Sequence, residues 1–517
     1  MTKYPCIMRL DHSESVRDLV STLRYPSLVL RHCFVIGYLV AASLFSVSSS
    51  TGTETSANTE YPAAIRSVLE CTKPLTKARG NRMPLLLWPV HAGVVSDQAT
   101  QEAIIRDLDA RGMAMIATWH PGNREKSLDD ALRIARIQKR LGLPVYVNAI
   151  SCMYAFYNGE ASTAHLDNQG KPFFDPSITG NKIGCPFRIR HRYAELTEQV
   201  AFFVRGYQEA KVPLDFVFGD WEVDGPLEVN RAWEAARRCQ VCRENIAEID
   251  TFEAFQKAVR IERSKATKEC YARPVLREYP QALIGNYGVY PHDGYRYWYD
   301  YFEEFAAYHP HATDQRARYR QWFDDFPLTG YTFAMPVVYP WARGYLWYDF
   351  PSADYRWIYN MLRVASNAGA HTPEEVPIVP FVHFAPIYEP DPGDDSIRPL
   401  TKTAYQELLW HMLLRGTDTF FLWCRGSRAQ LEIPPLHEVW AESLEYSQWL
   451  EKGHPVLFDV PKSQTPIVSA VRLGGRLLVR RTDLDESHPD AVTIKINGTS
   501  VDVPRIRGKM QVLEIGR

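Results

Sequence analysis

Short apolar runs alternate with longer amphipathic segments from Met83 onward, which is typical of a parallel sheet wrapped by helices. Helical patterns such as 99–112, 127–142, 193–210 and 402–416 separate the runs, and several end at glycine as helix C-termini do. Eight runs predict strands: 84–91, 113–120, 144–151, 214–222, 283–291, 331–340, 378–388 and 417–424. This α/β pattern predicts a (β/α)8 TIM barrel over residues 61–452.

The pattern changes after Gly453 to alternating apolar and polar residues with tight turns. Gly474-Gly475 and Asn497-Gly498 each separate two apolar-rich runs and predict two-residue hairpin turns. Asn497-Gly498-Thr499 also fits a glycosylation sequon, but the turn alone explains it. Residues 453–517 are therefore predicted to form a small all-β, sandwich-like domain.

The N-terminus has the order of a secretory signal. Arg31-His32 precede an apolar run from Cys33 to Phe45, and small polar residues follow it. The stretch before the run is long, so either the true start lies downstream or the signal is an extended one. Residues 1–60 are predicted to be a signal peptide and polar linker of an exported protein, periplasmic or extracellular, with an uncleaved membrane anchor as the alternative.

Charge and composition narrow the partners. Lys and Arg number 59 and Asp and Glu 61 in the 517 residues, a net charge of −2, so no basic face for a nucleic acid is indicated. The apolar run 33–45 is shorter than a membrane span, so no stable membrane partner is expected. Aromatic residues make up 12%, which suits either a large core or a binding cleft.

Nine cysteines do not indicate a disulfide scaffold. Cys239 and Cys242 lack a second CxxC pair for a zinc site; a structural or redox role stays open, and two incidental cysteines are the favoured interpretation.

Active sites of such barrels lie at the carboxyl ends of the strands, and here nearly every predicted strand ends in an aromatic residue or a histidine. Filling of the core would spread aromatic residues along the strands, whereas their concentration at one end predicts a sugar cleft lined by flat faces. The candidate substrate-binding residues are Trp88, Trp119, Trp221, Tyr287, Tyr290, Trp341, His383 and Trp423, and Tyr339 at the end of the sixth strand is a candidate catalytic residue.

Two carboxylates close the fourth predicted strand. Asp220 and Glu222 are spaced i, i+2, which places both on one face with Cα atoms about 6.6 Å apart. Ionisation of one raises the pKa of the other, which is how a site holds a protonated acid beside an ionised carboxylate. The alternative is a strand-end pair that makes salt bridges or caps a loop.

These residues resemble a known arrangement. D-x-E after the fourth strand, Tyr339 after the sixth and Trp423 after the eighth look like the pattern shared by chitinases and hyaluronidases. The segments 191–226, 284–301, 376–390 and 413–426 are more similar to the hyaluronidase family of endo-β-N-acetylhexosaminidases. The likeness runs with gaps over residues 190–427 and excludes the C-terminal β segment.

The resemblance implies substrate-assisted retaining hydrolysis, in which the 2-acetamido oxygen of the sugar attacks the anomeric carbon. Glu222 would be the acid and base, and Asp220 would hold the acetamido N–H. Tyr339 would hydrogen-bond the acetamido oxygen, Tyr287 would lie beside the same group, and Trp423 would form the hydrophobic floor under the acetamido methyl. The substrate would be an oligo- or polysaccharide, and no metal or organic cofactor is expected.

The chain also departs from the family. Asp224-Gly225-Pro226 stand where hyaluronidases usually have Trp-Arg-Pro, which removes a cation suited to uronate. Arg296, Arg343 and Arg425 lie near strand ends and are candidate substitutes, although arginines in barrel loops are more often only solvated.

Two other functions fit the sequence. One is a conventional retaining glycosidase with Glu222 as acid and base and Glu389 as nucleophile, which needs about 5 to 5.5 Å between the carboxyl groups. The other is a non-catalytic glycan-binding barrel, which would have no use for the carboxylate pair.

Overall fold

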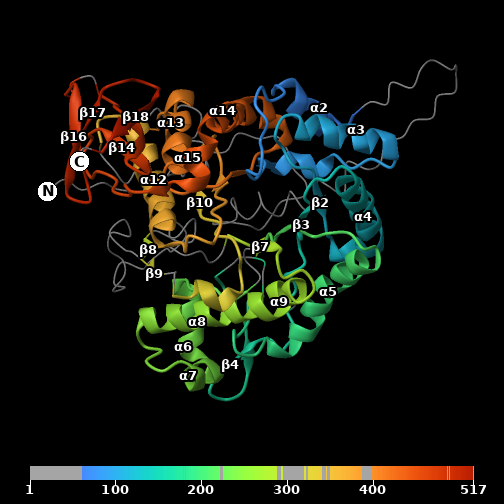
Figure 1. The fold of residues 1–517 in the computed structure, drawn as a ribbon. Helices are drawn as coiled ribbons and strands as arrows, with labels where there is room; N and C mark the ends of the chain where they lie inside the picture. The colour runs from blue at the N-terminus through green and yellow to red at the C-terminus, as the bar shows by residue number, and fades with distance from the viewer. Residues whose placement is uncertain are drawn as a thin grey trace, which may run out of the picture. The chain divides into compact units, whose positions relative to one another are not determined.

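The computed structural model describes residues 61–517 except 158, 178–179, 181, 222–224, 288–292, 295–319, 322–323, 341–344, 346–349, 387–396, 486, 488 and 516–517 (Figure 1). Within this part of the chain no helix is long and apolar enough to cross a membrane. The predicted signal segment lies outside the described residues.

Eight short parallel strands form the centre of the fold. They are β1 (Leu86–Leu87), β2 (Ile116–Thr118), β3 (Tyr146–Asn148), β6 (Phe216–Phe218), β7 (Leu283–Gly285), β10 (Val337–Val338), β11 (Phe381–Val382) and β12 (Phe421–Leu422). Each falls inside one of the eight predicted runs, which confirms those strands, although every strand is shorter than its run.

The eight strands make two parallel sheets, β2-β3-β6-β7 and β1-β12-β11-β10. Leu85 forms a parallel bridge with Met113, which links the β1 and β2 segments. Thr332 N donates to Ile284 O at 2.9 Å, which links the segment before β10 to β7. The result is a mixed α/β structure with parallel sheets, compatible with a TIM-barrel-like fold.

Helices follow most of the strands, and the four helical patterns named from the sequence are confirmed. Asp97 and Thr401 cap two of these helices by accepting from the backbone N–H groups of Thr100 and Ala404. Among the described residues, the helices of eight or more residues are α2 (Ala63–Glu70), α3 (Gln98–Asp109), α4 (Arg124–Arg140), α5 (Tyr193–Glu209), α6 (Asn230–Arg238), α8 (Phe252–Thr267), α12 (Ala353–His371), α13 (Lys402–Leu413) and α14 (Ala429–Ser443).

Shorter elements fill the connections. They are α7 (Gln240–Asn245), α9 (Arg273–Leu276), α15 (Ser447–Lys452), the 3₁₀ helix Trp88–Ala92, and the two-stranded pairs β4 (His165–Leu166) with β5 (Pro172–Phe173) and β8 (Asp293–Gly294) with β9 (Arg320–Gln321). The first pair lies in the long connection between β3 and α5, and α6 and α7 follow β6.

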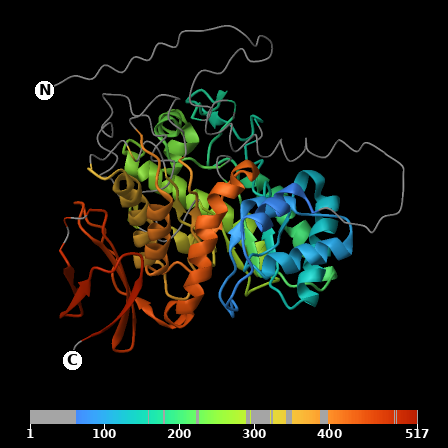
Figure 2. The same cartoon turned by 90° about the horizontal axis from the view of Figure 1, so that it is seen from above.

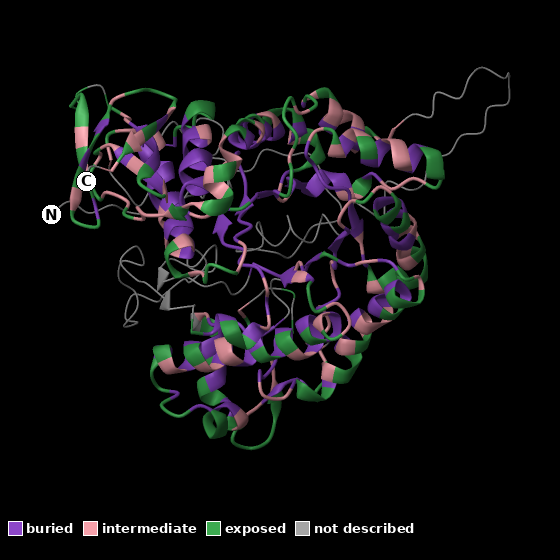
Figure 3. Cartoon of the chain, in the orientation of Figure 1, coloured by how far each residue is buried: buried purple, intermediate pink, exposed green. Residues whose placement is uncertain are grey.

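The core has two layers because successive side chains of a strand point to opposite faces. Val147, Val217 and Leu422 belong to the large buried cluster that includes the apolar faces of the helices. Figure 3 shows this burial along the strands and the inner sides of the helices. On the other strand face, Phe216 stacks on Phe333 with ring centroids 4.6 Å apart.

The C-terminal segment is all β. β13 (His454–Pro455), β14 (Ile467–Leu473), β15 (Arg476–Thr482) and β18 (Met510–Glu514) form an antiparallel sheet, and β16 (Ala491–Ile496) pairs with β17 (Thr499–Pro504). The two predicted turns are confirmed by the register on either side of them. Asn497 and Gly498 have φ of 50° and 83°, as a two-residue hairpin turn of this type requires.

Buried polar groups join this segment to the preceding helices. Arg480 of β15 pairs with Glu407 of α13 at 2.6 Å, and His411 of α13 lies within 2.9 Å of the Thr482 hydroxyl. Figure 2 shows the red C-terminal strands beside the orange helices. Ala57–Arg517 forms one compact unit, so this β segment packs as part of it.

Candidate functional site

Strand register brings several predicted residues to one level. Phe381 lies opposite both Val337 and Phe421, so the positions two residues further on are Tyr339, His383 and Trp423. Ring contacts confirm that these three side chains meet. The ring centroid of His383 lies 5.1 Å from that of Trp423 and 5.7 Å from that of Tyr339, and the centroids of Tyr339 and Trp423 are 6.4 Å apart.

The same rule applies across β6 and β7. Phe218 lies opposite Gly285, so the next positions on this face are Asp220 and Tyr287. Tyr287 stacks on Phe381 at 5.6 Å, which connects this pair to Tyr339 through a shared neighbour. We call Asp220, Tyr287, Tyr339, His383 and Trp423 the terminal layer.

Aromatic rings lie directly below the terminal layer. Phe218, Phe381 and Phe421 contact one another with centroids 4.9 to 5.6 Å apart, and Trp88 lies 6.3 Å from each of them. All four are buried, and Trp88 is only 6% exposed. Trp88 therefore belongs to the floor of the site, where it supports the layer above.

Asp220 is the acid of the terminal layer. The Tyr287 hydroxyl donates to Asp220 Oδ1 at 2.7 Å. Burial raises the pKa of Asp220 to about 6, because removal from water disfavours the ionised form, while the hydrogen bond from Tyr287 acts in the lowering direction. The carboxyl group is thus mainly ionised at neutral pH and protonated in mild acid.

Three members of the layer are half-buried, namely Asp220, Tyr339 and Trp423, whereas Tyr287 and His383 are buried. A carboxylate, a phenol and an indole are therefore the groups that a ligand reaches. A flat apolar face beside hydrogen-bonding groups suits a sugar ring, which has apolar C–H faces and polar edges.

Trp221 occupies a different environment from the one predicted. It is 1% exposed, its ring contacts Phe156 at 5.1 Å, and the Arg263 guanidinium lies 4.1 Å above it. It follows Asp220 directly, so its side chain points to the opposite strand face, toward the helices. The structure therefore places Trp221 in the core, away from the terminal layer.

Trp221 nevertheless fixes the chain next to Asp220. Asn286 accepts from Trp221 N at 3.3 Å and donates to Trp221 O at 2.7 Å, and Arg263 donates to the same oxygen at 3.2 Å. A Cβ at Gly225 would lie 2.2 Å from the indole, so only glycine fits there. Sequence reasoning missed Asn286, which is 1% exposed and carries no motif.

Trp119 also differs from its prediction. It is fully buried and stacks on Phe203 of α5 at 5.2 Å, with Tyr207 at 5.3 Å. Thr118 is the last residue of β2, and the next side chain faces the helix layer. Trp119 thus lies between the sheet and α5, where no sugar reaches it.

His383 has a partner that the sequence did not indicate. His383 Nδ1 lies 2.5 Å from Glu432 Oε2, and the same oxygen accepts from Phe384 N at 3.2 Å. Glu432 comes from α14 and is fully buried. A buried carboxylate therefore lies beside the imidazole that packs on Tyr339 and Trp423.

The remaining candidates are outside the described residues or exposed. Arg425 is exposed, two residues after Trp423. The candidates outside the described residues are Glu222, Tyr290, Trp341, Glu389, Arg296 and Arg343.

No protein-family model and no curated protein matches the sequence. Solved structures match at low identity. The chain is 10% identical to alpha-galactosidase AgaA of Geobacillus stearothermophilus over 86% of this chain and 56% of that one, with a TM-score of 0.41. It is 10% identical to alpha-L-fucosidase isoenzyme 2 of Paenibacillus thiaminolyticus, with 72% of this chain and 50% of that one covered and a TM-score of 0.39. The chain thus spans about half the length of that fucosidase.

A maltogenic alpha-amylase, AmyB of Thermotoga neapolitana, is 12% identical over 84% of this chain and 97% of its own, with a TM-score of 0.38.

Proposed function

We propose that the protein is a glycoside hydrolase that cleaves an oligo- or polysaccharide at a 2-acetamido sugar by substrate-assisted retaining catalysis. The observation that carries the proposal is the hydrogen bond from Tyr287 to Asp220 in one layer with Tyr339 and Trp423. These four residues are the ones that the hyaluronidase-like pattern assigns to the acetamido group.

In the first step Glu222 donates its proton to the leaving glycosidic oxygen, and the bond from that oxygen to the anomeric carbon breaks. The acetamido carbonyl oxygen attacks the same carbon and forms a cyclic oxazolinium ion. Asp220 accepts the acetamido N–H and, being ionised at neutral pH, stabilises the positive charge on the ring. The Tyr339 hydroxyl donates to the acetamido oxygen, and Trp423 packs against the methyl.

In the second step Glu222, now ionised, takes a proton from water as the water oxygen attacks the anomeric carbon. The oxazolinium ring opens, the acetamido group is restored and the product keeps the starting configuration. Two inversions at one carbon account for retention, and water is the only reactant besides the glycan.

The site lies at the ends of strands from both parallel sheets. We propose that the two parallel sheets belong to one (β/α)8 barrel, and the bridge at Leu85 and the hydrogen bond at Thr332 support that order of strands. Residues 453–517 would be a structural β domain. Export through the apolar segment 33–45 and an extracellular or periplasmic glycan are part of the same hypothesis.

Glu222→Gln tests the proposal, because the amide keeps the shape of the acid and removes its proton. We expect a loss of about a thousandfold or more in turnover of N-acetylated glycans, with glycan binding retained. Glu209→Gln, at the exposed end of α5, is the matched control and should leave turnover unchanged. Undiminished turnover by the Glu222 variant would contradict the assignment, and binding without turnover by the wild-type protein on every glycan tried would favour the non-catalytic alternative.

A further inference from the structure

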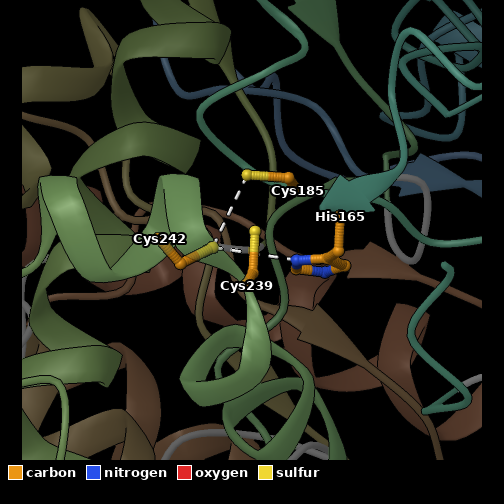
Figure 4. Close-up of side chains that lie close together, drawn as sticks. All are labelled: His165, Cys185, Cys239 and Cys242. Carbon is orange, nitrogen blue, oxygen red and sulfur yellow. Dashed lines mark hydrogen bonds between the residues drawn. The ribbon is translucent and has the colours of Figure 1, made fainter. Parts of the chain in front are cut away.

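Four metal-ligand side chains meet in the interior, apart from the terminal layer. They are His165, Cys185, Cys239 and Cys242, and their ligand atoms all lie within 4.8 Å of one another (Figure 4). Each of the three cysteines is fully buried and His165 is 2% exposed. The sequence showed Cys239 and Cys242 as a single CxxC pair, and the fold brings His165 and Cys185 next to them as the other two ligands.

The four residues come from distant parts of the chain. His165 lies in β4 and Cys185 in the connection from β5 to α5, whereas Cys239 lies between α6 and α7 and Cys242 lies in α7. In Figure 4 the two halves face each other, with the sulfur atoms and the imidazole directed to one common point.

The distances suit a tetrahedral ion. Cys185 Sγ and Cys242 Sγ are 3.5 Å apart, and Cys242 Sγ lies 3.7 Å from His165 Nδ1. Ligands at about 2.3 Å for sulfur and 2.0 Å for nitrogen around zinc stand roughly 3.5 to 3.8 Å from each other. A disulfide would need about 2.05 Å between sulfur atoms, and the cysteines of the described chain are all free thiols.

The surroundings favour an ion that organises structure. α7 has six residues and β4 and β5 have two each, too few to be stable from local hydrogen bonds alone. His165 stacks on Phe173 at 5.2 Å, and the Arg238 guanidinium lies 4.6 Å from the same ring. Three thiolates and zinc carry a net charge of −1, which a nearby cation balances.

We propose that His165, Cys185, Cys239 and Cys242 bind one structural zinc ion. The four ligands complete its coordination, as in structural Cys₃His sites, so the ion has no open position for substrate. Zinc would tie the connection after β3 to the connection after β6, and these two strands are paired neighbours. The ion thereby holds α6 and α7, which follow the Asp220 segment, without taking part in hydrolysis.

The test measures metal on the whole protein, purified without added metal or strong chelator. Elemental analysis is expected to give about one zinc per chain, and X-ray absorption at the zinc edge should show three sulfur ligands and one nitrogen. Cys242→Ser is expected to lower the zinc content at least tenfold, whereas Cys71→Ser, outside the cluster, should keep one zinc per chain.

Measurements on the wild-type protein keep the test decisive if Cys242→Ser does not fold. Blocking thiols with a mercurial reagent should release one zinc, and removal of zinc by a chelator should lower Tm in a way that added zinc reverses. Three results would each overturn the proposal. The wild-type protein could hold no zinc even after refolding with zinc chloride, its zinc could have only oxygen and nitrogen ligands, or a disulfide could be mapped among the three cysteines. None of these results depends on glycosidase activity.

Discussion

The Tyr287 hydroxyl donates a 2.7 Å hydrogen bond to Oδ1 of Asp220, the half-buried carboxyl group at the end of β6. Burial alone favours the protonated form of this acid, and the hydrogen bond favours the ionised form. The balance sets the pH range in which Asp220 carries the negative charge that the proposed intermediate needs.

Tyr287→Phe removes the hydrogen bond and leaves the effect of burial unopposed. The pKa of Asp220 should rise, so the acidic limb of the kcat/KM profile moves to higher pH. At pH 5 the expected loss in kcat/KM is about tenfold, the size of one hydrogen bond to a charged group. A pH series of initial rates measures it.

Tyr279→Phe is the matched control for that series, because the Tyr279 hydroxyl donates to Val212 O in the outer layer. Its acidic limb should coincide with that of the wild type. If the pH profile of Tyr287→Phe shows no shift, the hydrogen bond from Tyr287 does not set the pKa of the group that controls the acidic limb.

Asp220→Asn should separate stability from activity. Because the folded pKa, about 6, lies above the ordinary value of 3.8, the folded state binds more protons than the unfolded state between these values. The wild-type free energy of unfolding therefore falls as pH rises from about 4 to 6. The neutral amide of Asp220→Asn does not titrate, so this pH-dependent fall in the free energy of unfolding is absent from the variant.

At pH 7.5 Asp220→Asn should thus be more stable than wild type by about 1 to 2 kcal/mol, allowing for partial exposure of the carboxyl group, and the advantage should vanish below pH 4. Turnover should fall steeply. Urea unfolding at both pH values measures the first effect, with Asp129→Asn, an exposed site, as the control. Equal pH dependence in wild type and Asp220→Asn would contradict the raised pKa.

Trp423 and Trp119 should respond differently to truncation. Trp423→Ala removes a half-buried ring of the terminal layer, so we expect weaker glycan binding and a higher KM with a small change in Tm. Trp119→Ala leaves a cavity beside Phe203 and should cost about 3 to 5 kcal/mol of stability. Binding titrations and thermal unfolding of both variants measure these effects. If Trp423→Ala is strongly destabilised and its KM is unchanged, the Trp423 ring belongs to the core and not to the binding site.

We expect Arg415 to stabilise the packing of the C-terminal strands against the preceding helices. Arg415 is 1% exposed, and its guanidinium donates to Phe458 O at 2.7 Å, Asp459 O at 3.0 Å and the Ser469 hydroxyl at 2.8 Å. Arg415→Met leaves these acceptors without their charged donor and should cost about 3 kcal/mol or more. Arg476→Met, at an exposed site of β15, is the control. An unchanged denaturation midpoint for the Arg415 variant would show that these contacts add no stability.

The strands were predictable because apolar residues rich in β-branched and aromatic types repeat between capped amphipathic helices. Alternation along the strand places the adjacent Asp220 and Trp221 on opposite faces, but which of the two faces meets the helices and which meets Tyr287 is decided by packing against neighbouring elements. Partners from remote segments carried no local signal either. Asn286 beside Trp221, Glu432 beside His383, and Cys185 beside Cys242 become neighbours only in the folded chain.

In the proposed mechanism, the acetamido group held by Asp220 and Tyr339 is the nucleophile. A series of one substrate whose N-acetyl group carries zero, one, two or three fluorine atoms tests it most directly, because each fluorine makes the carbonyl oxygen a weaker nucleophile. We expect kcat/KM to fall steeply and steadily along the series, with no covalent glycosyl-enzyme seen by mass spectrometry. A rate that stays level across the series, or a trapped glycosyl ester on a carboxylate such as Glu389, would contradict it.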